Sequence, residues 1–414
     1  MSIIRRSLAC AAVLLAAGLA GSASAAPSGS IKLLASSEFR PALEKVIADF
    51  QKATNVTVDI SYTDEGSINT VLPTQLSSGA GPDVFTSWPG TYAANSAVLL
   101  GQRGYAMDLS SESWAKDVPA RFGNFVGFDN KIFYPPLGAL AVVAMYNDSA
   151  LDSLGLKKPS TWTEVLNFCK AATDKGVTAF AFGAQTDWQN QMLPLLLSVT
   201  LVDRVDPTFL SDRAAGKAKF ATSPWVAVFA KEQTMLKAGC FGDKALGLSF
   251  EQAQTEVGAG HYLGMFAPAS TFAGLTATNA SAKFSVAAFP ATDNADETWL
   301  PVALGGSYAV NANTQNAEAA KAFVDFLLQP ENVAPYVAAT GQAPVLPNKD
   351  FVPDDVTKLQ IAMGDAGKTA PVCDQIFPNP KVRAVWISQN EAMLAGKVEP
   401  KDITQAMDDA WDGN

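Results

Sequence analysis

The chain has 414 residues, of which 48% are hydrophobic and 17% are charged, with 30 basic and 40 acidic side chains. This length allows two domains with sizeable cores, and the balance of apolar and charged residues is that of a globular protein rather than a disordered or membrane-embedded one. The net charge of −10 disfavours nucleic acid as a partner, because phosphate backbones are bound by clustered Lys and Arg.

The first 25 residues have the three parts of a secretory signal peptide. Arg5 and Arg6 form a basic start, residues 8–20 are apolar, and Ala23-Ser24-Ala25 matches a cleavage site. Cleavage removes two arginines and no acids, so we expect a mature chain of net charge −12 that is soluble outside the cytoplasm. Two alternatives stay open: the segment could remain as an uncleaved membrane anchor, and the paired arginines could direct twin-arginine export instead of general secretion.

Alternating segments at the start of the mature chain predict a parallel sheet. Strands are expected at 31–35, 56–62 and 83–86, with helices between them. This β-α-β-α-β order implies right-handed crossovers, and ligands of open α/β sheets bind beyond the carboxyl ends of the strands. Those ends carry Ser37, Glu38, Asp64 and Trp88.

An apolar stretch at 140–145 predicts a buried strand that leaves one core and delivers the chain to another. A helix then starts at Thr161, with Glu164 at the spacing of a capping box. A strand at 177–183 ends in a polar loop, a strand near 265 ends in a loop of small residues, and a return crossing is expected at 305–311. We detect no internal repeat and no flexible linker, and the segment after residue 344 is expected to be helical.

Ordered motifs give the chain a resemblance to a known family. They are the segment 141–166 (strand, MYN, short helix, GL, PxTWxE), Gly-Pro-Asp-Val at 81–84, Gly-Gly-Ser-Tyr-Ala-Val-Asn at 305–311 and Gly-Lys-Val-Glu-Pro at 396–400. In this order they resemble the family-1, sugar-binding extracellular solute-binding proteins of ABC importers. The resemblance implies an α/β, two-lobed periplasmic binding protein fold, in which each lobe is a mostly parallel sheet flanked by helices and crossing strands join the lobes. It also implies a periplasmic monomer whose partner is a membrane permease.

The crossings predict how the chain divides. Residues 26–140 and 304–335 are expected in lobe one, and residues 145–300 and 340–414 in lobe two. Hinges are expected near 140–146 and 301–307, and a third crossing near 335–342.

The motifs of common enzymes are missing. His261 is the only histidine, and there is no G-x-S-x-G elbow, zinc-ligand spacing, P-loop or G-x-G-x-x-G. We therefore expect no enzyme activity, metal or cofactor. A secreted carbohydrate-active enzyme built on paired carboxylates stays as the alternative.

The strand-end loops instead carry side chains suited to a neutral saccharide or polyol, because aromatic faces stack on sugar rings and polar groups bind hydroxyls. Trp88 and Trp188 are the first candidates, one from each lobe. The other candidate ligand-binding residues are Ser37, Glu38, Asp64, Gln185, Asp187, Ser270, Thr271, Phe272, Trp299, Gly305, Gly306 and Gln342.

The resembling family often carries a ligand-contacting Trp after its GxxAM strand, where residues 267–272 contain none. Phe272, or the hydroxyls of Ser270 and Thr271, would stand in for that indole. A further alternative is the same fold with an anionic ligand such as a sugar phosphate, for which Arg40 and Arg383 are the candidate cations.

Cys169, Cys240 and Cys373 remain after cleavage. A pair is plausible in an oxidising compartment, and we expect Cys240 to bond Cys373. Cys169, on a predicted buried helix face, is expected to stay a thiol.

Overall fold

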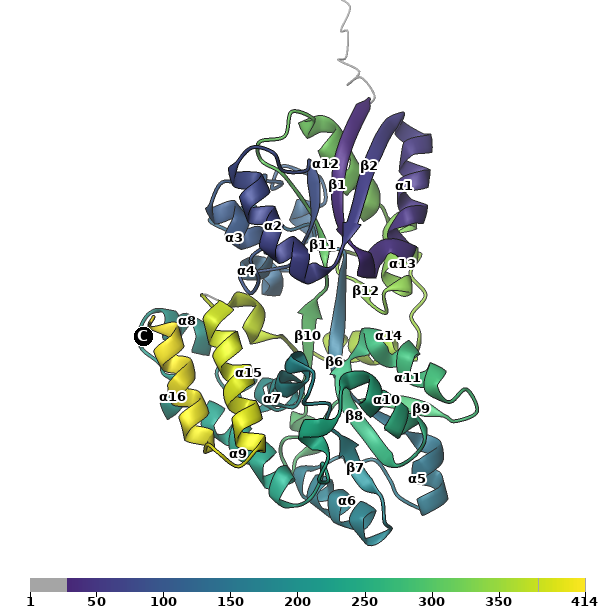
Figure 1. Cartoon of the computed structure of the whole chain (residues 1–414), viewed down its shortest axis with the longest axis vertical. Helices are drawn as coiled ribbons and strands as arrows, with labels where there is room; N and C mark the ends of the chain where they lie inside the picture. Colours follow the sequence, from purple (N-terminus) through teal and green to yellow (C-terminus); the bar gives the residue numbers. More distant parts are fainter. Residues whose placement is uncertain (1–27, 379, 414) are drawn as a thin grey trace, which may run out of the picture.

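A computed structural model describes residues 28–378 and 380–413. It shows two lobes stacked along the long axis of the molecule, with β6 and β10 running between them (Figure 1). The predicted signal peptide lies outside the described residues. Within the described part of the chain, no helix combines the length and apolar character needed to cross a bilayer.

Lobe one is built on a four-stranded sheet in the order β11-β3-β1-β2. β1 pairs in parallel with β2 and β3, as the sequence predicts, and the return strand β11 pairs antiparallel with β3. The strands are β1 (Gly29–Ser36), β2 (Val56–Thr63), β3 (Val84–Ser87) and β11 (Ser307–Val310); the main helices are α1 (Arg40–Thr54), α2 (Glu65–Ser77), α3 (Ala97–Gln102), α4 (Gly123–Val126), α12 (Ala317–Leu328) and α13 (Pro330–Ala339). A small hairpin of β4 (Gly127–Phe128) and β5 (Lys131–Ile132) completes the lobe.

Lobe two is built on a seven-stranded sheet centred on β6 (Gly138–Asn147). The sheet is mixed rather than mostly parallel, because β6 enters from lobe one and β8, β9, β10 and β12 all run against it. Among the described strands of this second sheet, only β7–β8 and β10–β13 pair in parallel. The other strands are β7 (Thr178–Ala181), β8 (Tyr262–Pro268), β9 (Phe284–Ala287), β10 (Leu300–Leu304), β12 (Ala343–Pro344) and β13 (Thr369–Pro371).

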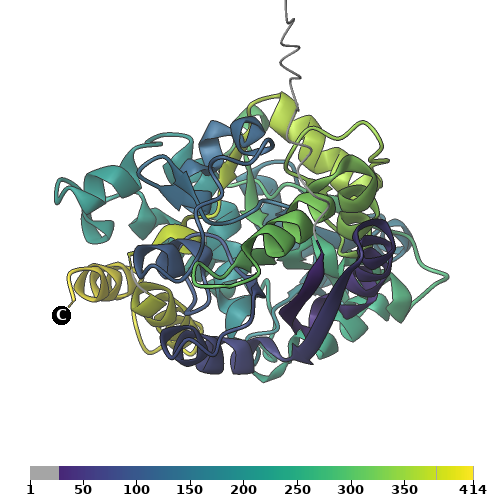
Figure 2. The same cartoon turned by 90° about the horizontal axis from the view of Figure 1, so that it is seen from above.

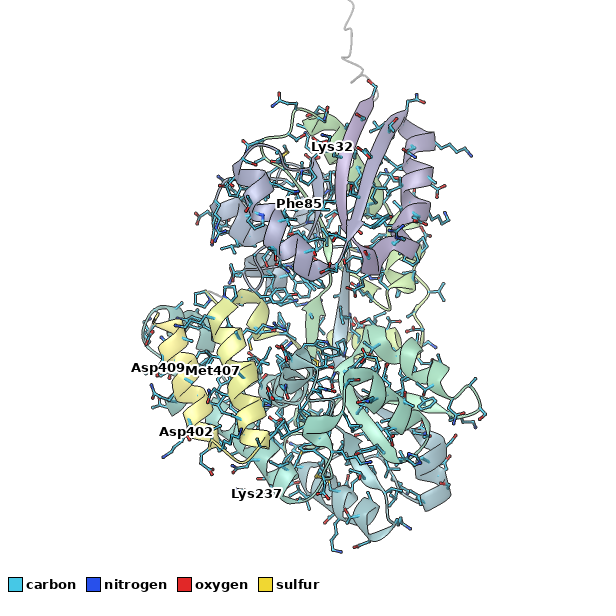
Figure 3. The ribbon with its side chains drawn as sticks, in the orientation of Figure 1. Lys32, Phe85, Lys237, Asp402, Met407 and Asp409 are labelled. Carbon is cyan, nitrogen blue, oxygen red and sulfur yellow. A yellow bond between two sulfur atoms is a disulfide. The ribbon has the colours of Figure 1, made fainter. Side chains whose placement is uncertain are left out.

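Helices cover this second sheet and extend to one side of it. They are α5 (Asp148–Leu154), α6 (Trp162–Asp174), α7 (Met192–Ser198), α8 (Phe209–Ala214), α9 (Trp225–Lys237), α10 (Phe250–Gly258), α11 (Phe272–Thr278), α14 (Asp355–Asp365), α15 (Pro380–Leu394) and α16 (Pro400–Trp411). The C-terminal α16 lies at the outer edge of the molecule, away from β1 and β2 (Figures 1 and 2). Seen with its side chains, α16 is amphipathic: Met407 is buried, whereas Asp402 and Asp409 are exposed (Figure 3).

The start of α6 shows how local sequence sets a boundary. The Thr161 hydroxyl accepts a hydrogen bond from the backbone N–H of Glu164, as the capping spacing predicts. The Glu164 carboxylate reaches back to the N–H of Ser160. The buried face of the helix comprises Val165, Phe168, Cys169 and Ala172.

The lobe boundaries drawn from the sequence stay a prediction, and the third crossing is longer than a single turn. After α13 the chain pairs with β6 through β12. Leu346 and Phe351, which the predicted division gives to lobe two, pack against a core of lobe one, and Val356 of α14 then joins a core of lobe two.

The disulfide joins Cys169 to Cys240, with Cα atoms 4.8 Å apart, so the predicted Cys240–Cys373 bridge is wrong. Helix α6, which carries Cys169, packs on β7. The N–H of Phe180 in β7 donates a hydrogen bond to the carbonyl of Cys240. This shared neighbour places the two cysteines together. Cys373 is buried as a free thiol.

We predict that Cys169→Ala or Cys240→Ala lowers the free energy of unfolding by about 2–5 kcal/mol, because the bridge closes a long loop in the unfolded chain. Cys373→Ala keeps the bridge and serves as the control. Denaturant unfolding measures the loss, and peptide mapping without reductant identifies the bonded pair; a bridge that contains Cys373 would contradict the structure.

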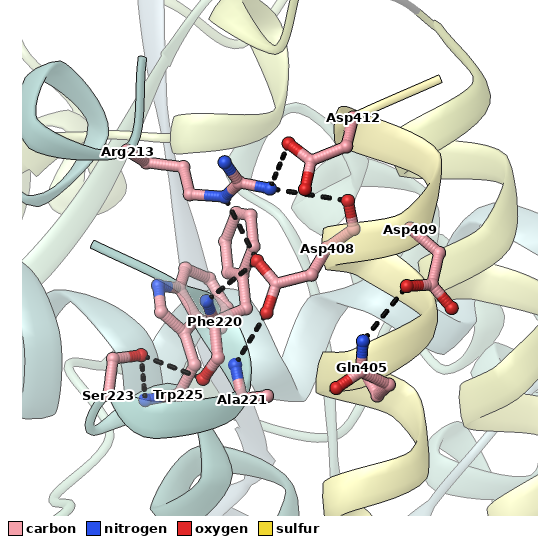
Figure 4. A network of polar contacts seen from close by, with 9 residues as sticks. All are labelled: Arg213, Phe220, Ala221, Ser223, Trp225, Gln405, Asp408, Asp409 and Asp412. Carbon is pink, nitrogen blue, oxygen red and sulfur yellow. Dashed lines mark hydrogen bonds and ion pairs between the residues drawn. The ribbon is translucent and has the colours of Figure 1, made fainter. Parts of the chain in front are cut away.

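A buried ion pair fastens α16 to the rest of lobe two (Figure 4). Arg213 Nε lies 2.9 Å from Asp408 Oδ1, and both side chains are almost fully buried. The same carboxylate accepts the backbone N–H groups of Phe220 and Ala221. Asp412 Oδ1 lies 2.7 Å from Arg213 Nη2 and accepts a hydrogen bond from this second nitrogen of the guanidinium.

Asp408→Ala should therefore cost about 3–5 kcal/mol of stability, because it leaves the buried Arg213 Nε–H and two backbone donors without their acceptor. Asp409→Ala is the matched control. Its exposed carboxylate bonds only Gln405 in Figure 4, and its loss should change stability by less than about 0.5 kcal/mol. Equal unfolding midpoints for the two variants would refute this assignment.

Candidate functional site

A cleft of about 590 Å³ lies between the lobes. Its lining comes from both lobes and from the crossing segments: Leu140 and Val142 of β6 and Ala303 of β10 form part of it. The predicted residues that line this cleft are Glu38, Trp88, Trp188, Ser270, Thr271, Gly305, Gly306 and Gln342. The indoles of Trp88 and Trp188, far apart in the chain, thus border one cavity.

Trp88 forms the wall of the cleft on the side of lobe one. It directly follows β3, and its ring packs at 6.3 Å from Phe39 and edge-on at 5.9 Å from Tyr92. Its Nε1–H donates to Glu65 Oε1 at 2.6 Å. The indole is therefore held on one side by a carboxylate and leaves a face for the cleft.

Glu65, the first residue of α2, is the anchor of this wall. The same Oε1 also accepts hydrogen bonds from the amides of Asn95 and Asn69, while Oε2 is buried with no partner among the described residues. Burial raises the pKa of Glu65 to about 7, although the hydrogen bonds from Asn95 and Trp88 act in the opposite direction.

Trp188 forms the facing wall, on the short helix η4 (Asp187–Gln191) that follows β7. Its ring centroid lies 4.7 Å from that of Phe250. The Asn390 amide of α15 donates to the carbonyl of Asn190 at 2.7 Å and to Glu232 Oε1 at 3.0 Å. These buried contacts fix η4 against α15 and α9, which sets the position of Trp188.

Polar side chains connect the two walls. Arg383 of α15 bonds Gln191 Oε1 at 3.0 Å and Asp374 Oδ2 at 3.3 Å, and its guanidinium lies 5.3 Å from the centre of the Tyr92 ring. Burial raises the pKa of Asp374, although the neighbouring Arg383 lowers it. Asp374 belongs to η10 (Cys373–Ile376), where the Gln375 carbonyl accepts the N–H of Thr91 from lobe one.

Gly305 and Gly306 occupy the turn between β10 and β11, where close approach requires glycine. A Cβ on Gly305 would lie 2.1 Å from Gln342 Oε1, and one on Gly306 would lie 2.6 Å from the Phe39 ring. Tyr134 also donates its hydroxyl to the Gly305 carbonyl. Because Gly305 and Gly306 have no side chains, Gln342 and Phe39 can pack directly against the crossing turn.

Glu38 lines the cleft and is exposed. Surrounding protein nevertheless removes enough water to raise the pKa of this carboxyl. It forms no hydrogen bond or ion pair with the described residues, unlike Glu65 and Asp374.

Several predicted residues lie outside the cleft lining. Asp64 caps α2 by accepting the N–H of Ser67, Phe272 packs against a core of lobe two, and the N–H of Trp299 donates to Thr200 Oγ1. Ser37, Gln185 and Asp187 are exposed and do not line the cavity. Because neighbouring residues in a loop point in different directions, proximity to Glu38 or Trp188 did not bring them into the cleft.

Sequence reasoning missed Phe39, Tyr92, Gln191, Thr340, Asp374 and Gln375, which all line the cleft. Tyr92 had a signal, since it follows Trp88 at the same strand end. Asp374 and Gln375 had none, because the segment after residue 344 was expected to be helical, whereas β13 and η10 lie there. Arg383 was considered only as a partner for anions, and Arg40 instead stacks on Tyr62, 3.9 Å from its ring centre.

The family model described as "Bacterial extracellular solute-binding protein" matches residues 36–334. The chain belongs to this family. The match begins at the end of β1 and covers β6 and the β10–β11 turn, so it includes Trp88, Trp188 and the glycine pair.

Two curated relatives resemble parts of this solute-binding protein. The "Multiple sugar-binding protein" of Streptococcus mutans is 26% identical over 151 residues, which is 36% of this chain and 35% of the relative. A "Probable sugar-binding periplasmic protein" of Rhizobium meliloti is 32% identical over 82 residues, 20% of each chain. The aligned part thus spans about a third of the first relative and a fifth of the second.

Solved structures share the fold over nearly the whole chain. A family 1 extracellular solute-binding protein from Bifidobacterium longum subsp. infantis superposes with a TM-score of 0.76 at 22% identity, over 94% of this chain and 100% of that one. A sugar transporter from Bacillus licheniformis in complex with stachyose gives 0.72 at 18% identity, over 92% and 98%. At these identities the likeness establishes the two-lobed α/β fold.

Glu232, beneath the Trp188 wall, should make stability depend on pH. Burial raises the pKa of Glu232 from 4.5 to about 8, although the hydrogen bond from Asn390 lowers it. The folded state therefore keeps a proton that the unfolded chain releases, so this contribution to stability is complete below the ordinary pKa and is lost as the pH rises through about 8.

We predict that Glu232→Gln flattens the fall in melting temperature between about pH 5 and about pH 9, because glutamine cannot be deprotonated. Glu391→Gln, at an exposed position of the neighbouring α15, is the control and should follow the wild-type profile. Parallel pH profiles for wild type and Glu232→Gln would show that Glu232 does not titrate in this range.

Proposed function

We propose that this solute-binding protein captures a saccharide or polyol in the cleft between its lobes and delivers it to the membrane permease of an ABC importer. The observation that carries the proposal is the pair of indoles, one from each lobe, bordering one cavity together with polar side chains. Stacked aromatic faces and several hydrogen-bonding groups are what a sugar ring requires. The sugar-binding names of the curated relatives agree with this assignment.

The arrangement of the walls also supports capture by closure. Trp88 belongs to lobe one and Trp188 to lobe two, while the lobes are joined by β6, by the β10–β11 turn and by the segment after α13. A sugar that contacts both indoles binds the closed form better than the open form, so binding shifts the hinge equilibrium. The closed form would then dock on the permease from the periplasm.

Several observations favour binding over catalysis. His261, the single histidine of the sequence, is exposed and paired with Glu256 rather than placed in the cleft. In the cleft lining, Trp88 is instead bonded to Glu65 and Asp374 to Arg383, which suits a rigid recognition surface. An anionic cargo has weaker support, because the guanidinium of Arg383 already neighbours the carboxylate of Asp374.

Isothermal titration against a panel of mono- and oligosaccharides tests the proposal. We expect at least one neutral sugar to bind, and Trp88→Ala or Trp188→Ala to weaken its affinity about tenfold or more, because truncating a buried aromatic anchor removes most of its contact energy. Trp299→Ala is the matched control outside the cleft. The proposal fails if no sugar gives heat, or if both cleft variants bind like wild type.

A further inference from the structure

Some polar atoms of the cleft lining have no hydrogen-bond partner. The kind of atom left unpaired, donor or acceptor, indicates which groups the cargo must supply. Two buried side-chain atoms of the lining have no partner among the described residues, Gln342 Oε1 and Asp374 Oδ1. Gln342 is 4% exposed and Asp374 is 5% exposed. Both atoms are acceptors, and a buried acceptor without a donor is costly. A cargo that brings donors to them relieves this cost.

The orientation of the Gln342 amide follows from its neighbour. The Thr340 hydroxyl lies within hydrogen-bonding distance of the carbonyls of Tyr336 and Val337, at 3.1 and 3.2 Å, and uses its hydrogen there. It can then only accept from Gln342 Nε2, at 3.1 Å. The amide nitrogen of Gln342 therefore faces Thr340, and its oxygen lies next to the backbone of Gly138 and of Gly305, the second of which lines the cleft.

The charges of the lining do not cancel. Its acidic and basic side chains are Glu38, Asp374 and Arg383, and Arg383 is paired with Asp374. Glu38 has no such partner in the described residues and leaves one uncompensated negative charge. Burial raises the pKa of both Glu38 and Asp374, as expected for carboxyl groups that lack enough donors or positive charge nearby.

These acceptors line the same cleft as residues 304–306 of the crossing turn. Gln342 Oε1 lies where a Cβ on Gly305 would stand, and Gln375, the neighbour of Asp374, exchanges two hydrogen bonds with the backbone of Leu304. On the other side, Phe39, the neighbour of Glu38, packs against Gly306. The acceptors are thus supplied by both lobes around the crossing turn.

Building on the proposed function, we propose that the cargo is a saccharide that carries a protonated amino group, with Glu38 and Asp374 as its carboxylate partners and Gln342 as a further acceptor. An ammonium group offers three donors, no acceptor and a positive charge, so it meets all the requirements above. A hydroxyl offers one donor and no charge. A uronic acid or sugar phosphate would add repulsion to the uncompensated carboxylate.

Titration calorimetry with matched sugars tests this inference at about pH 6.5, where an ordinary amine is protonated. Cellobiose, its diamino analogue from chitosan and diacetylchitobiose share one backbone and carry a hydroxyl, an amine and an acetamide at the same ring carbon. Glucose with glucosamine, and galactose with galactosamine, extend the comparison. In at least one set the amine should bind about tenfold or more tightly than the hydroxyl sugar, because the hydrogen bonds become charge-assisted.

Variants then assign the preference to the cleft. Glu38→Gln should reduce the ratio between amine and hydroxyl sugars to less than about twofold, because it removes the uncompensated charge but keeps an acceptor. Glu44→Gln, an exposed glutamate on α1, should keep the full ratio. Asp374→Asn, a second variant, should also reduce it.

The outcomes separate this inference from the proposed function. If neutral sugars bind and no amino sugar binds more tightly than its hydroxyl partner, the cargo inference is overturned and sugar capture stands. If the preference survives in both Glu38→Gln and Asp374→Asn, the assignment to these carboxylates is overturned. If no sugar in the panel binds, amino or neutral, the proposed function fails and the inference fails with it.

Discussion

The passage of β6 from one lobe into the other is the constraint on which this structure depends. Its ten residues pair with β10 and β12 near the crossing and with β8 and β9 further on, so the strand is both the link between the lobes and the centre of the second sheet. Successive side chains of a strand point to opposite faces. Leu140 and Val142 accordingly line the cleft, whereas Ala139 lines a smaller cavity of about 210 Å³. The same strand, β6, therefore joins the lobes and lines the cleft.

The walls on either side of these strands are held by buried polar contacts rather than by packing alone. In lobe one, Glu65 accepts hydrogen bonds from the side chains of Trp88, Asn69 and Asn95. In lobe two, Asn390 ties η4 to Glu232. Burial raises the pKa values of Glu65 and Glu232 to about 7 and about 8. Each wall is therefore fixed in place before a ligand arrives, and such preorganisation favours tight binding.

Much of the fold and part of the cleft could be predicted from the chain. Apolar periodicity located the first three strands, and the position of Trp88 directly after β3 follows from the rule on strand ends. The same rule located Trp188, but it also selected Gln185 and Asp187, which are exposed. A strand end places a loop near the cleft, whereas the dihedral angles within the loop decide which side chains face it.

The sequence by itself determined features that depend on neighbours a few residues away, such as the cap of α6 by Thr161. Only the tertiary structure decided which distant segments meet. It paired Cys169 with Cys240, because both lie against β7, and it brought Arg383, Asp374 and Tyr92 together across the lobes. Contacts of this kind depend on how whole elements pack, and packing of a core specifies volume and polarity without leaving a periodic mark in the chain.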